Sequence, residues 1–336
     1  MFSDKEIKEI HELLKTNKKI VILAHHNPDG DAIGSSLGLH NFLLNCGIES
    51  NIIVPNDFPK FLKWMPNAKS IIIAEYKKQL AYQLIKNAEI IFCLDFNDAN
   101  RIDHLQTHLE DSKAIKILID HHQQPQAFNY IYSDTSEPAT CQMVYKFIDK
   151  LNLEFNIDKN VAQCLYSGIL TDTGSFRFRN TTSETHKIIA NLIEKGAEPD
   201  LISSNILDSN SPERIKLLGV LLEKMIIIPE NKTTILYLNR EELTKNGYQK
   251  GDTEGFVNYG LSIMGIRFSA LILDDLQNDH RRLSFRSKGD FDVNTFMRQN
   301  FQGGGHFNAS GGKSYDSIEV IIEKIKKLIQ NEKELQ

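Results

Sequence analysis

The stretch IVILAHHNPDGD, residues 20–31, runs from five apolar residues directly into two histidines and two nearby aspartates. Its apolar part is short, rich in β-branched residues and bounded by polar residues, which predicts a buried strand. Residues 49–54, 90–94 (IIFCL) and 115–119 (IKILI) have the same character. Residues 32–45 have the spacing of an amphipathic helix. Strands that alternate with helices predict a parallel sheet with helices on both faces.

Aspartate and histidine follow the apolar segments of this half. The first segment leads into His25, His26, Asn27, Pro28, Asp29, Gly30 and Asp31, and the later ones lead into Asp95, Asp120-His121-His122 and, after CLYSGIL, Asp172. Each piece alone also fits a turn or a helix cap. Four such strand ends together are harder to explain as caps. Because ligands of parallel α/β sheets bind beyond the carboxyl ends of the strands, we expect one shared site.

The residue types at these ends indicate bound cations. Several carboxylates in one crevice repel one another unless cations neutralise them. Oxygen and imidazole ligands without thiolates favour Mn²⁺ or Mg²⁺ over a structural zinc ion. More carboxylates than one ion needs suggest two ions about 3.5–4 Å apart, an arrangement suited to phosphoester hydrolysis.

The C-terminal half carries a second polar pattern. Residues 232–240, 265–275 and 281–289 read as strands. In the last of them, RRLSFRSKG, alternation places Arg282, Ser284, Arg286 and Lys288 on one face. The glycines of GGGH, residues 303–306, predict a loop whose backbone approaches an anion. We expect Arg286 and Lys288 to contact a ligand, whereas Arg281 and Arg282 fit a solvated strand face.

Composition and charge exclude several classes of protein. With 41% hydrophobic and 25% charged residues among 336, the chain is neither disordered nor a disulfide scaffold. A formal net charge of −5 argues against coating long nucleic acid, but it permits a small anionic ligand. The four cysteines form no C-x-x-C pair, which indicates thiols in a reducing compartment. Because no signal peptide or membrane-spanning segment is evident, we expect a cytoplasmic protein that does not bind a membrane.

These motifs resemble the DHH phosphoesterases. His25-x-x-x-Asp29-x-Asp31, Asp95, Asp120-His121-His122 and Ser167-Gly168-Ile169-x-x-Asp172-Thr173-Gly174 look like the four motifs of that family, in its order. Ser284-Phe285-Arg286-Ser287 and Gly303–His306 resemble the DHH-associated C-terminal domain. The resemblance implies two α/β domains with a cleft between them. We expect a catalytic domain at 1–195, a helical linker at 196–225 and a smaller substrate-binding domain at 226–336.

The resemblance also implies a role for each matching residue. His25 and Asp29 would bind one metal ion, Asp31, His121 and Asp172 the other, and Asp95 would bridge them. Asp120 would orient an imidazole, and His122 would face the scissile phosphate. A structural or supporting role suits His26. Contacts to the substrate are implied for Arg101, Arg267, Ser284, Arg286, Gly303, Gly304, Gly305 and His306, and the strand pattern adds Lys288. A solvated helix start explains Arg101 nearly as well.

The implied activity is hydrolysis of short oligoribonucleotides (nanoRNA, pApA) and of pAp by water that two divalent ions activate, with Mn²⁺ preferred over Mg²⁺ or Co²⁺. A cyclic di-AMP phosphodiesterase and a nucleotide-sensing protein without catalysis are the alternatives. The C-terminal motifs disfavour a family-II pyrophosphatase, and a RecJ-type exonuclease would need a longer chain. The partner would be a small nucleotide or short single-stranded RNA. Only the resemblance implies a homodimer, and the sequence does not choose among the substrates.

Overall fold

The computed structural model describes residues 1–16 and 18–336. The chain divides into two compact units, 1–209 and 210–336. The stretch expected to be a linker, 196–225, contributes α8 (Pro199–Ile206) to the first unit and α9 (Pro212–Glu223) to the second. Over the described ranges, every helix is too short or too polar to cross a lipid bilayer.

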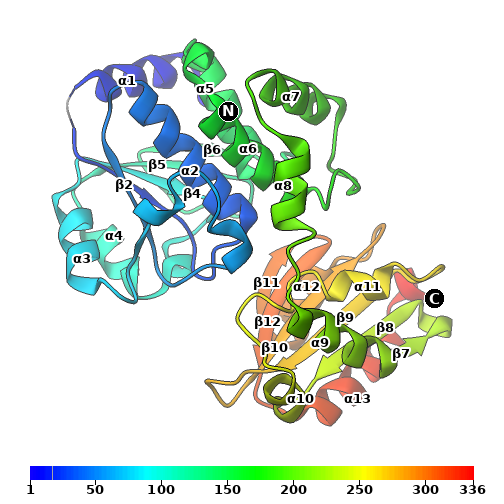
Figure 1. The fold of residues 1–336 in the computed structure, drawn as a ribbon. Coiled ribbons are helices and arrows are strands. Elements are labelled where there is room, and N and C mark those ends of the chain that lie inside the picture. The colour runs from blue at the N-terminus through cyan, green and yellow to red at the C-terminus, as the bar shows by residue number, and fades with distance from the viewer. Residues whose placement is uncertain (17) are drawn as a thin grey trace. The chain divides into compact units, whose positions relative to one another are not determined.

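The first unit is built on a sheet of six parallel strands in the order β3-β2-β1-β4-β5-β6 (Figure 1). The strands are β1 (Ile20–Leu23), β2 (Ser50–Val54), β3 (Ile72–Ile73), β4 (Ile90–Leu94), β5 (Ile115–Asp120) and β6 (Tyr130–Ser133). The four predicted strands are confirmed, and the edge strands β3 and β6 were not predicted. The strand order reverses between β1 and β4, which is where a sheet of this kind leaves a crevice for ligands.

Helices cover both faces of this sheet, as predicted. Alternate strand residues divide between two apolar cores, with Ile22 and Phe92 in one and Leu23 and Cys93 in the other. The first core includes residues of α1 (Asp4–Lys15), α2 (Gly30–Asn45), α5 (Thr140–Lys150), α6 (Lys159–Asp172), α7 (Ser183–Glu194) and α8. The second includes residues of α3 (Lys78–Asn87) and α4 (Gln106–Asp111). Residues 192–207 are largely helical.

Helices α2 and α6 approach each other closely because glycines line their contact. Gly30, Gly34 and Gly38 recur every four residues and therefore share one face of α2. A Cβ added at Gly34 would lie 2.7 Å from the carbonyl oxygen of Cys164 on α6. A Cβ at Gly168 of α6 would lie 2.1 Å from Cys141 Sγ. The close approach brings the first turn of α2 beside the last turn of α6.

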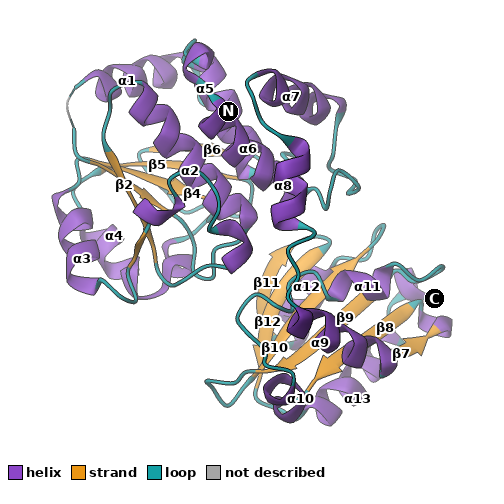
Figure 2. Cartoon of the chain, in the orientation of Figure 1, coloured by secondary structure: helices purple, strands orange, loops and turns teal. Residues whose placement is uncertain are grey.

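The second unit is a mixed sheet in the order β11-β12-β10-β9-β8-β7, in which β8 and β9 are parallel and the other pairs antiparallel. Figure 2 shows its strands in orange. They are β7 (Ile226–Ile228), β8 (Thr233–Leu238), β9 (Phe268–Asp274), β10 (Arg281–Ser287), β11 (Gln302–His306) and β12 (Ala309–Ser314). One core includes α9, α10 (Arg240–Lys245) and α11 (Val257–Leu261), and the other α12 (Val293–Asn300) and α13 (Ile318–Ile329). A second α/β unit is thus confirmed.

The GGGH segment is a strand and not the predicted loop. It forms β11, which pairs with β12 in an antiparallel hairpin. Steric crowding explains its glycines, because a Cβ at Gly303 would lie 2.1 Å from the carbonyl oxygen of Gly311. A Cβ at the facing Gly312 would lie 2.5 Å from Met297 Sδ. The glycines therefore let this hairpin form beneath α12.

Candidate metal centre

The predicted site residues of the first unit meet beyond the ends of β1, β4 and β5. These three strands are neighbours in the sheet, so residues that follow them lie side by side. His25, Asp95 and the pair His121-His122 follow the three strands in that order. Asp172 is the exception, because it is the last residue of helix α6 and does not end a strand. The apolar run before it is explained by a helix that is buried on most sides.

Asp95 lies at the centre of this cluster. Its Oδ2 atom is 3.4 Å from His25 Nε2, and its Oδ1 atom is 3.4 Å from His121 Nε2. The residue has a φ of +62°, a left-handed conformation that aspartate adopts at a cost of about 1–3 kcal/mol. Its side chain is almost fully buried. The two carboxylate oxygens of this residue, whose backbone is strained, thus face two different histidines.

The surrounding ligand atoms fall into overlapping groups. Three of these groups are drawn entirely from the first unit, and in each the atoms lie within 4.8 Å of one another: His25, Asp29 and Asp95; Asp31, Asp95 and His121; and Asp95, Asp120 and His122. His121 Nε2 also lies 3.7 Å from Asp31 Oδ2 and 3.4 Å from Asp172 Oδ2. Asp95 is common to all three groups. Two adjacent cation positions that share Asp95 fit this arrangement.

Backbone carbonyls set the orientation of two imidazoles. His25 Nδ1 is 2.9 Å from the carbonyl oxygen of His26, and His121 Nδ1 is 3.1 Å from that of Glu137. Each ring therefore directs Nε2 at the carboxylates. Such a contact on the second nitrogen fixes the tautomer of a metal-binding histidine.

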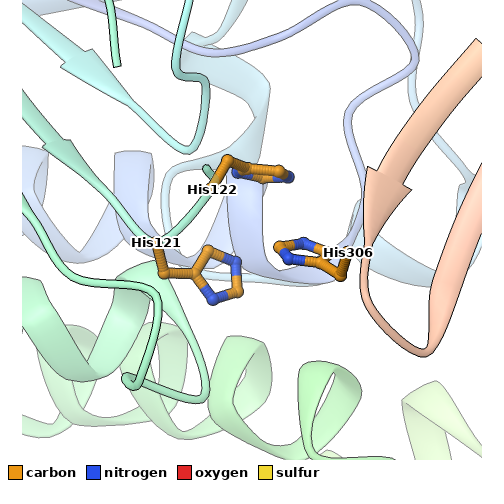
Figure 3. A group of neighbouring side chains, drawn as sticks. All are labelled: His121, His122 and His306. Atoms are coloured by element: carbon orange, nitrogen blue, oxygen red, sulfur yellow. The ribbon is translucent and has the colours of Figure 1, made fainter. Parts of the chain in front are cut away.

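His122 has a different partner. Its Nδ1 atom lies 2.7 Å from Asp120 Oδ1, and its backbone N–H donates to Asp120 Oδ2 at 3.0 Å. Asp120 is fully buried and holds His122 through these two hydrogen bonds. Figure 3 shows His121 and His122 beside each other after β5, and their ring planes stand at 78° to each other.

Asp29 and Asp31 are held by the starts of two helices. Asp29 caps α2, and its Oδ1 accepts from the N–H groups of Asp31 and Ala32 at 3.1 Å each. The capping explanation is therefore right for Asp29, but it does not exclude the residue from the cluster. Asp31 accepts from the backbone N–H groups of Thr140 at 2.6 Å and Cys141 at 2.8 Å, in the first turn of α5.

Thr140 is a site residue that the sequence reasoning missed. Besides its backbone bond to Asp31, its hydroxyl donates to Asp95 Oδ1 at 2.9 Å. Its position just after the proline-containing segment EPA, at the start of a helical pattern, was the available signal. Cys141 beside it has a buried thiol that contacts the carbonyl oxygen of Asp31 at 3.5 Å. The groups of ligand atoms described above consist of aspartates and histidines alone.

The carboxyl groups of the cluster lie close together and most of them are buried, so nearby positive charge would stabilise their ionised form. Burial, followed by the charge of Asp95, raises the pKa of Asp31 to about 7 and that of Asp120 to about 7. Burial and the carboxylate of Asp31 raise the pKa of Asp172 well above its usual value. Although burial opposes it, contact with Asp95 raises the pKa of His121 well above its usual value. The protein alone stabilises these carboxylates incompletely, so divalent cations fit the donor set.

Arg101 and His26 lie at the border of the cluster. Arg101 is in the 3₁₀ segment Ala99–Leu105, and its carbonyl oxygen accepts from the His26 N–H at 2.7 Å. After burial, the charge of Arg101 is the largest cause that lowers the pKa of His122. The ring of His26 is 40% exposed, and its Nδ1 lies 3.7 Å from Asp103 Oδ2. His26 thus supports the loop that holds Arg101.

The predicted substrate contacts of the second unit lie on three adjacent strands. Arg286 of β10 and His306 of β11 both pair in register with Ala309 of β12. Two rows further, Ser284 and Gly304 both pair with Gly311. His306, which Figure 3 also labels, is the last residue of β11. These strands bring Ser284, Arg286, His306 and Gly303–Gly305 together.

Arg267 and Lys288 are neighbours next to these strands. The backbone N–H of Lys288 donates to the carbonyl oxygen of Arg267 at 2.8 Å. The side chain of Lys288 donates to the carbonyl oxygen of Leu261, and that of Arg267 to the carbonyl oxygen of Glu334 at 3.2 Å. Both residues are exposed, and the side chain of each also forms a hydrogen bond to a backbone carbonyl oxygen.

Comparison with known proteins gives consistent matches to both units. The DHH family N-terminal domain matches residues 19–169, and the DHHA1 domain matches residues 231–331. The bifunctional oligoribonuclease and PAP phosphatase NrnA of Thermus thermophilus is 28% identical over 96% of this chain and 93% of its own. The protein of the same name from Bacillus subtilis is 27% identical over 92% and 94%. The crystal structure of an exopolyphosphatase-related protein from Bacteroides fragilis superposes with a TM-score of 0.93 and 37% identity, over 98% and 96%.

Proposed function

The chain belongs to the DHH family of phosphoesterases and carries a DHHA1 domain after its DHH domain, and from this we propose that it hydrolyses phosphoester bonds in short oligoribonucleotides and in pAp. One observation carries the proposal most directly. The two oxygens of Asp95 face His25 and His121, an arrangement that would suit a carboxylate shared by two cations. Relatives named as bifunctional oligoribonucleases and PAP phosphatases, alike over nearly their whole length, support this choice of substrates.

Two ion positions follow from the donor atoms. His25, Asp29 and Asp95 would hold one cation, and Asp31, Asp95, His121 and Asp172 the other. Oxygen and imidazole donors make Mn²⁺ our first choice, with Mg²⁺ and Co²⁺ as alternatives. When bound, such ions supply a water molecule of lowered pKa and screen the charge of the phosphoryl oxygens.

The remaining residues position the substrate and the nearby proton carriers. Because Nδ1 of His122 is hydrogen-bonded to Asp120, His122 would contact the scissile phosphoryl group through Nε2. Burial lowers the pKa of His122 well below its usual value, so its ring is neutral at pH 7. Arg101, whose charge lowers the pKa of His122, would balance the charge of the phosphate.

The second unit would hold the distal part of the substrate. Arg286 supplies a planar cation that suits a phosphate, and the pairing of β10, β12 and β11 brings His306 into its row. Ser284 and the glycines of β11 would complete this grip with a hydroxyl and backbone atoms. We assign Arg267 and Lys288 to its margin. A grip of limited extent favours two-to-five-residue RNAs and single nucleotides over polymers.

A substrate panel tests the proposal. Metal-stripped protein is reconstituted with Mn²⁺, Mg²⁺ or Co²⁺ and incubated with pAp, pApA, five-residue RNA and cyclic di-AMP, and the products are separated by chromatography. We expect inactive stripped protein, the highest kcat/KM with Mn²⁺, and turnover of the linear substrates and pAp. Full activity after metal removal would contradict the proposal. A preference for cyclic di-AMP would favour the alternative phosphodiesterase, and binding without turnover would favour a nucleotide sensor.

A further inference from the structure

A tight fold-back follows the last aspartate of the metal centre. Gly174, Ser175 and Phe176 are consecutive residues with left-handed φ values of +55°, +62° and +62°. The Ser175 N–H donates to the carbonyl oxygen of Leu170 at 2.8 Å, which returns the chain to the end of α6. Two non-glycine residues in this conformation are unusual, and such backbone strain concentrates at functional sites. The fold-back therefore places specific side chains beside Asp172.

The two aromatic residues of this segment point to different surroundings. Phe176 packs inward against Tyr166 and His186, with ring centroids 5.9 Å and 5.7 Å away. Phe178 is instead 41% exposed. A Cβ added at Gly174 would lie 2.5 Å from Phe178 Cζ, so the ring lies directly against the bare backbone two residues after Asp172. Packing thus explains Phe176 but leaves an exposed aromatic surface at Phe178.

Cations flank this exposed ring in the chain. Arg177 and Arg179 lie on either side of Phe178, and all three are exposed. The backbone N–H groups of Arg177 and Phe178 both donate to the carbonyl oxygen of Thr173 at 3.0 Å, and Arg177 Nε donates to that of Gly174 at 2.7 Å. The aromatic ring and the guanidinium of Arg177 are thus fixed to the turn that follows Asp172.

An exposed aromatic ring between cations is the combination that single-stranded nucleic acids recognise, because every base offers a flat face for stacking. Resting on the proposed function, we propose that Phe178 stacks on the base of the nucleoside whose phosphate is hydrolysed. Arg177, whose Nε donates to the carbonyl oxygen of Gly174, would balance the charge of that phosphate. The substrate class is accordingly nucleotides that carry a base on the reacting residue, and not phosphate monoesters in general.

The experiment compares a substrate with a base and one without it. The wild type and Phe178→Ala are assayed with Mn²⁺ on adenosine 3′,5′-bisphosphate and on ribose 3′,5′-bisphosphate. We expect Phe178→Ala to lower kcat/KM for the adenosine compound about ten-fold, mostly through KM, and to leave the ribose compound unchanged. Phe178→Tyr should restore the wild-type value. Equal losses on both compounds, or no loss on either, would overturn the proposal.

Two controls separate this proposal from the activity itself. Phe155→Ala removes another exposed phenylalanine of the same unit, 71% exposed in the segment Glu154–Asn156, and should change neither rate. If the wild type hydrolyses neither compound, the proposed function fails. Stacking is then judged by calorimetric binding of the two bisphosphates to Ca²⁺-loaded protein. Tighter binding of the adenosine compound that Phe178→Ala abolishes supports the stacking role, and equal binding of both refutes it.

Discussion

A single aspartate organises the candidate centre at the scale of residues. Asp95 contacts His25 through one oxygen and His121 through the other, and it also accepts a hydrogen bond from the hydroxyl of Thr140. Burial would raise its pKa, but the hydrogen bonds from His121 and His25 hold that pKa well below its usual value. Asp95 therefore stays ionised near neutral pH, where Asp31, with a pKa of about 7, is partly protonated. Loss of that charge should affect both cation positions together.

We expect Asp95→Asn to lower kcat/KM by more than about 100-fold and to weaken binding of two metal equivalents, since substitutions that only support a metal ligand already cost about 10–100-fold. Metal content by mass spectrometry and calorimetric titration provide the measurement. Asp149→Asn is the matched control, because Asp149 is exposed on α5, away from the cluster. Retention of one tightly bound ion would show that Asp95 serves a single position.

Asp120→Asn should separate positioning from metal binding. Asp120 holds His122 through two hydrogen bonds, and it lies one residue from His121. The asparagine amide has one oxygen, so it can accept only one of these two hydrogen bonds, and it carries no negative charge. We therefore expect kcat to fall about 10²–10⁴-fold while both ions remain bound. His121→Ala should instead lose metal. Equal loss of metal in both variants would mean that Asp120 is itself a ligand.

At the scale of elements, the approach of α2 to α6 determines whether the centre can form. Asp31 lies in the first turn of α2, and Asp172 ends α6. A Cβ at Gly168 would lie only 3.0 Å from Asp31 Oδ1 as well as against Cys141 Sγ. The glycines at the contact thus leave the room that Asp31 and Asp172 need to lie in one cluster.

Gly168→Ala should destabilise the protein by about 1–3 kcal/mol, the usual cost of an overfilled core, and weaken metal binding. Adding Cys141→Ala should recover part of the stability, because the thiol is the nearest obstacle. Gly219→Ala is the control, since Gly219 lies in α9 with no atom within 4 Å of the added Cβ. That change should stabilise the protein by up to about 1 kcal/mol. Urea unfolding with and without Mn²⁺ measures both effects, and an unaltered Gly168→Ala protein would contradict the argument.

At the scale of the whole molecule, the cluster makes stability depend on pH and metal. The carboxyls of Asp31 and Asp120 have a pKa of about 7 in the folded protein, against 3.8 for an ordinary aspartate. Between these values the folded state holds more protons than the unfolded state, so stability falls as pH rises. The raised pKa of His121 acts in the same direction, and the lowered pKa of His122 opposes it below about pH 6.5.

We therefore expect the metal-free protein to lose at least about 1 kcal/mol of unfolding free energy between about pH 5 and about pH 8. Saturating Mn²⁺ should stabilise the protein more at the higher pH, because the ions bind the ionised carboxylates. Urea titrations of stripped and reconstituted protein measure this difference. Asp31→Asn should flatten the pH dependence of the stripped protein. A stripped protein that gains stability on alkalinisation would contradict the expected sign.

Much of this architecture is readable in the sequence, because its signals are local. The central strands are continuous apolar runs, and the polar residues that end them identify the cluster. Strand β3 has only two residues and left no such signal. The amides of Thr140 and Cys141 serve Asp31 from more than one hundred residues away, a contact that no local pattern encodes. The β11–β12 hairpin was missed because glycines that allow close packing look like loop glycines.

The thiol of Cys141 bears on how this protein withstands oxidants. Cys141 is completely buried, and burial and the charge of Asp31 raise its pKa well above the usual value. Since oxidation and alkylation need an accessible thiolate, this sulfur is inert although it touches the backbone of Asp31. Cys93 and Cys164 are buried too, which leaves Cys46 as the partly exposed one of the four. A centre of oxygen and nitrogen donors beside a shielded thiol should keep working in peroxide that inactivates thiolate-dependent enzymes.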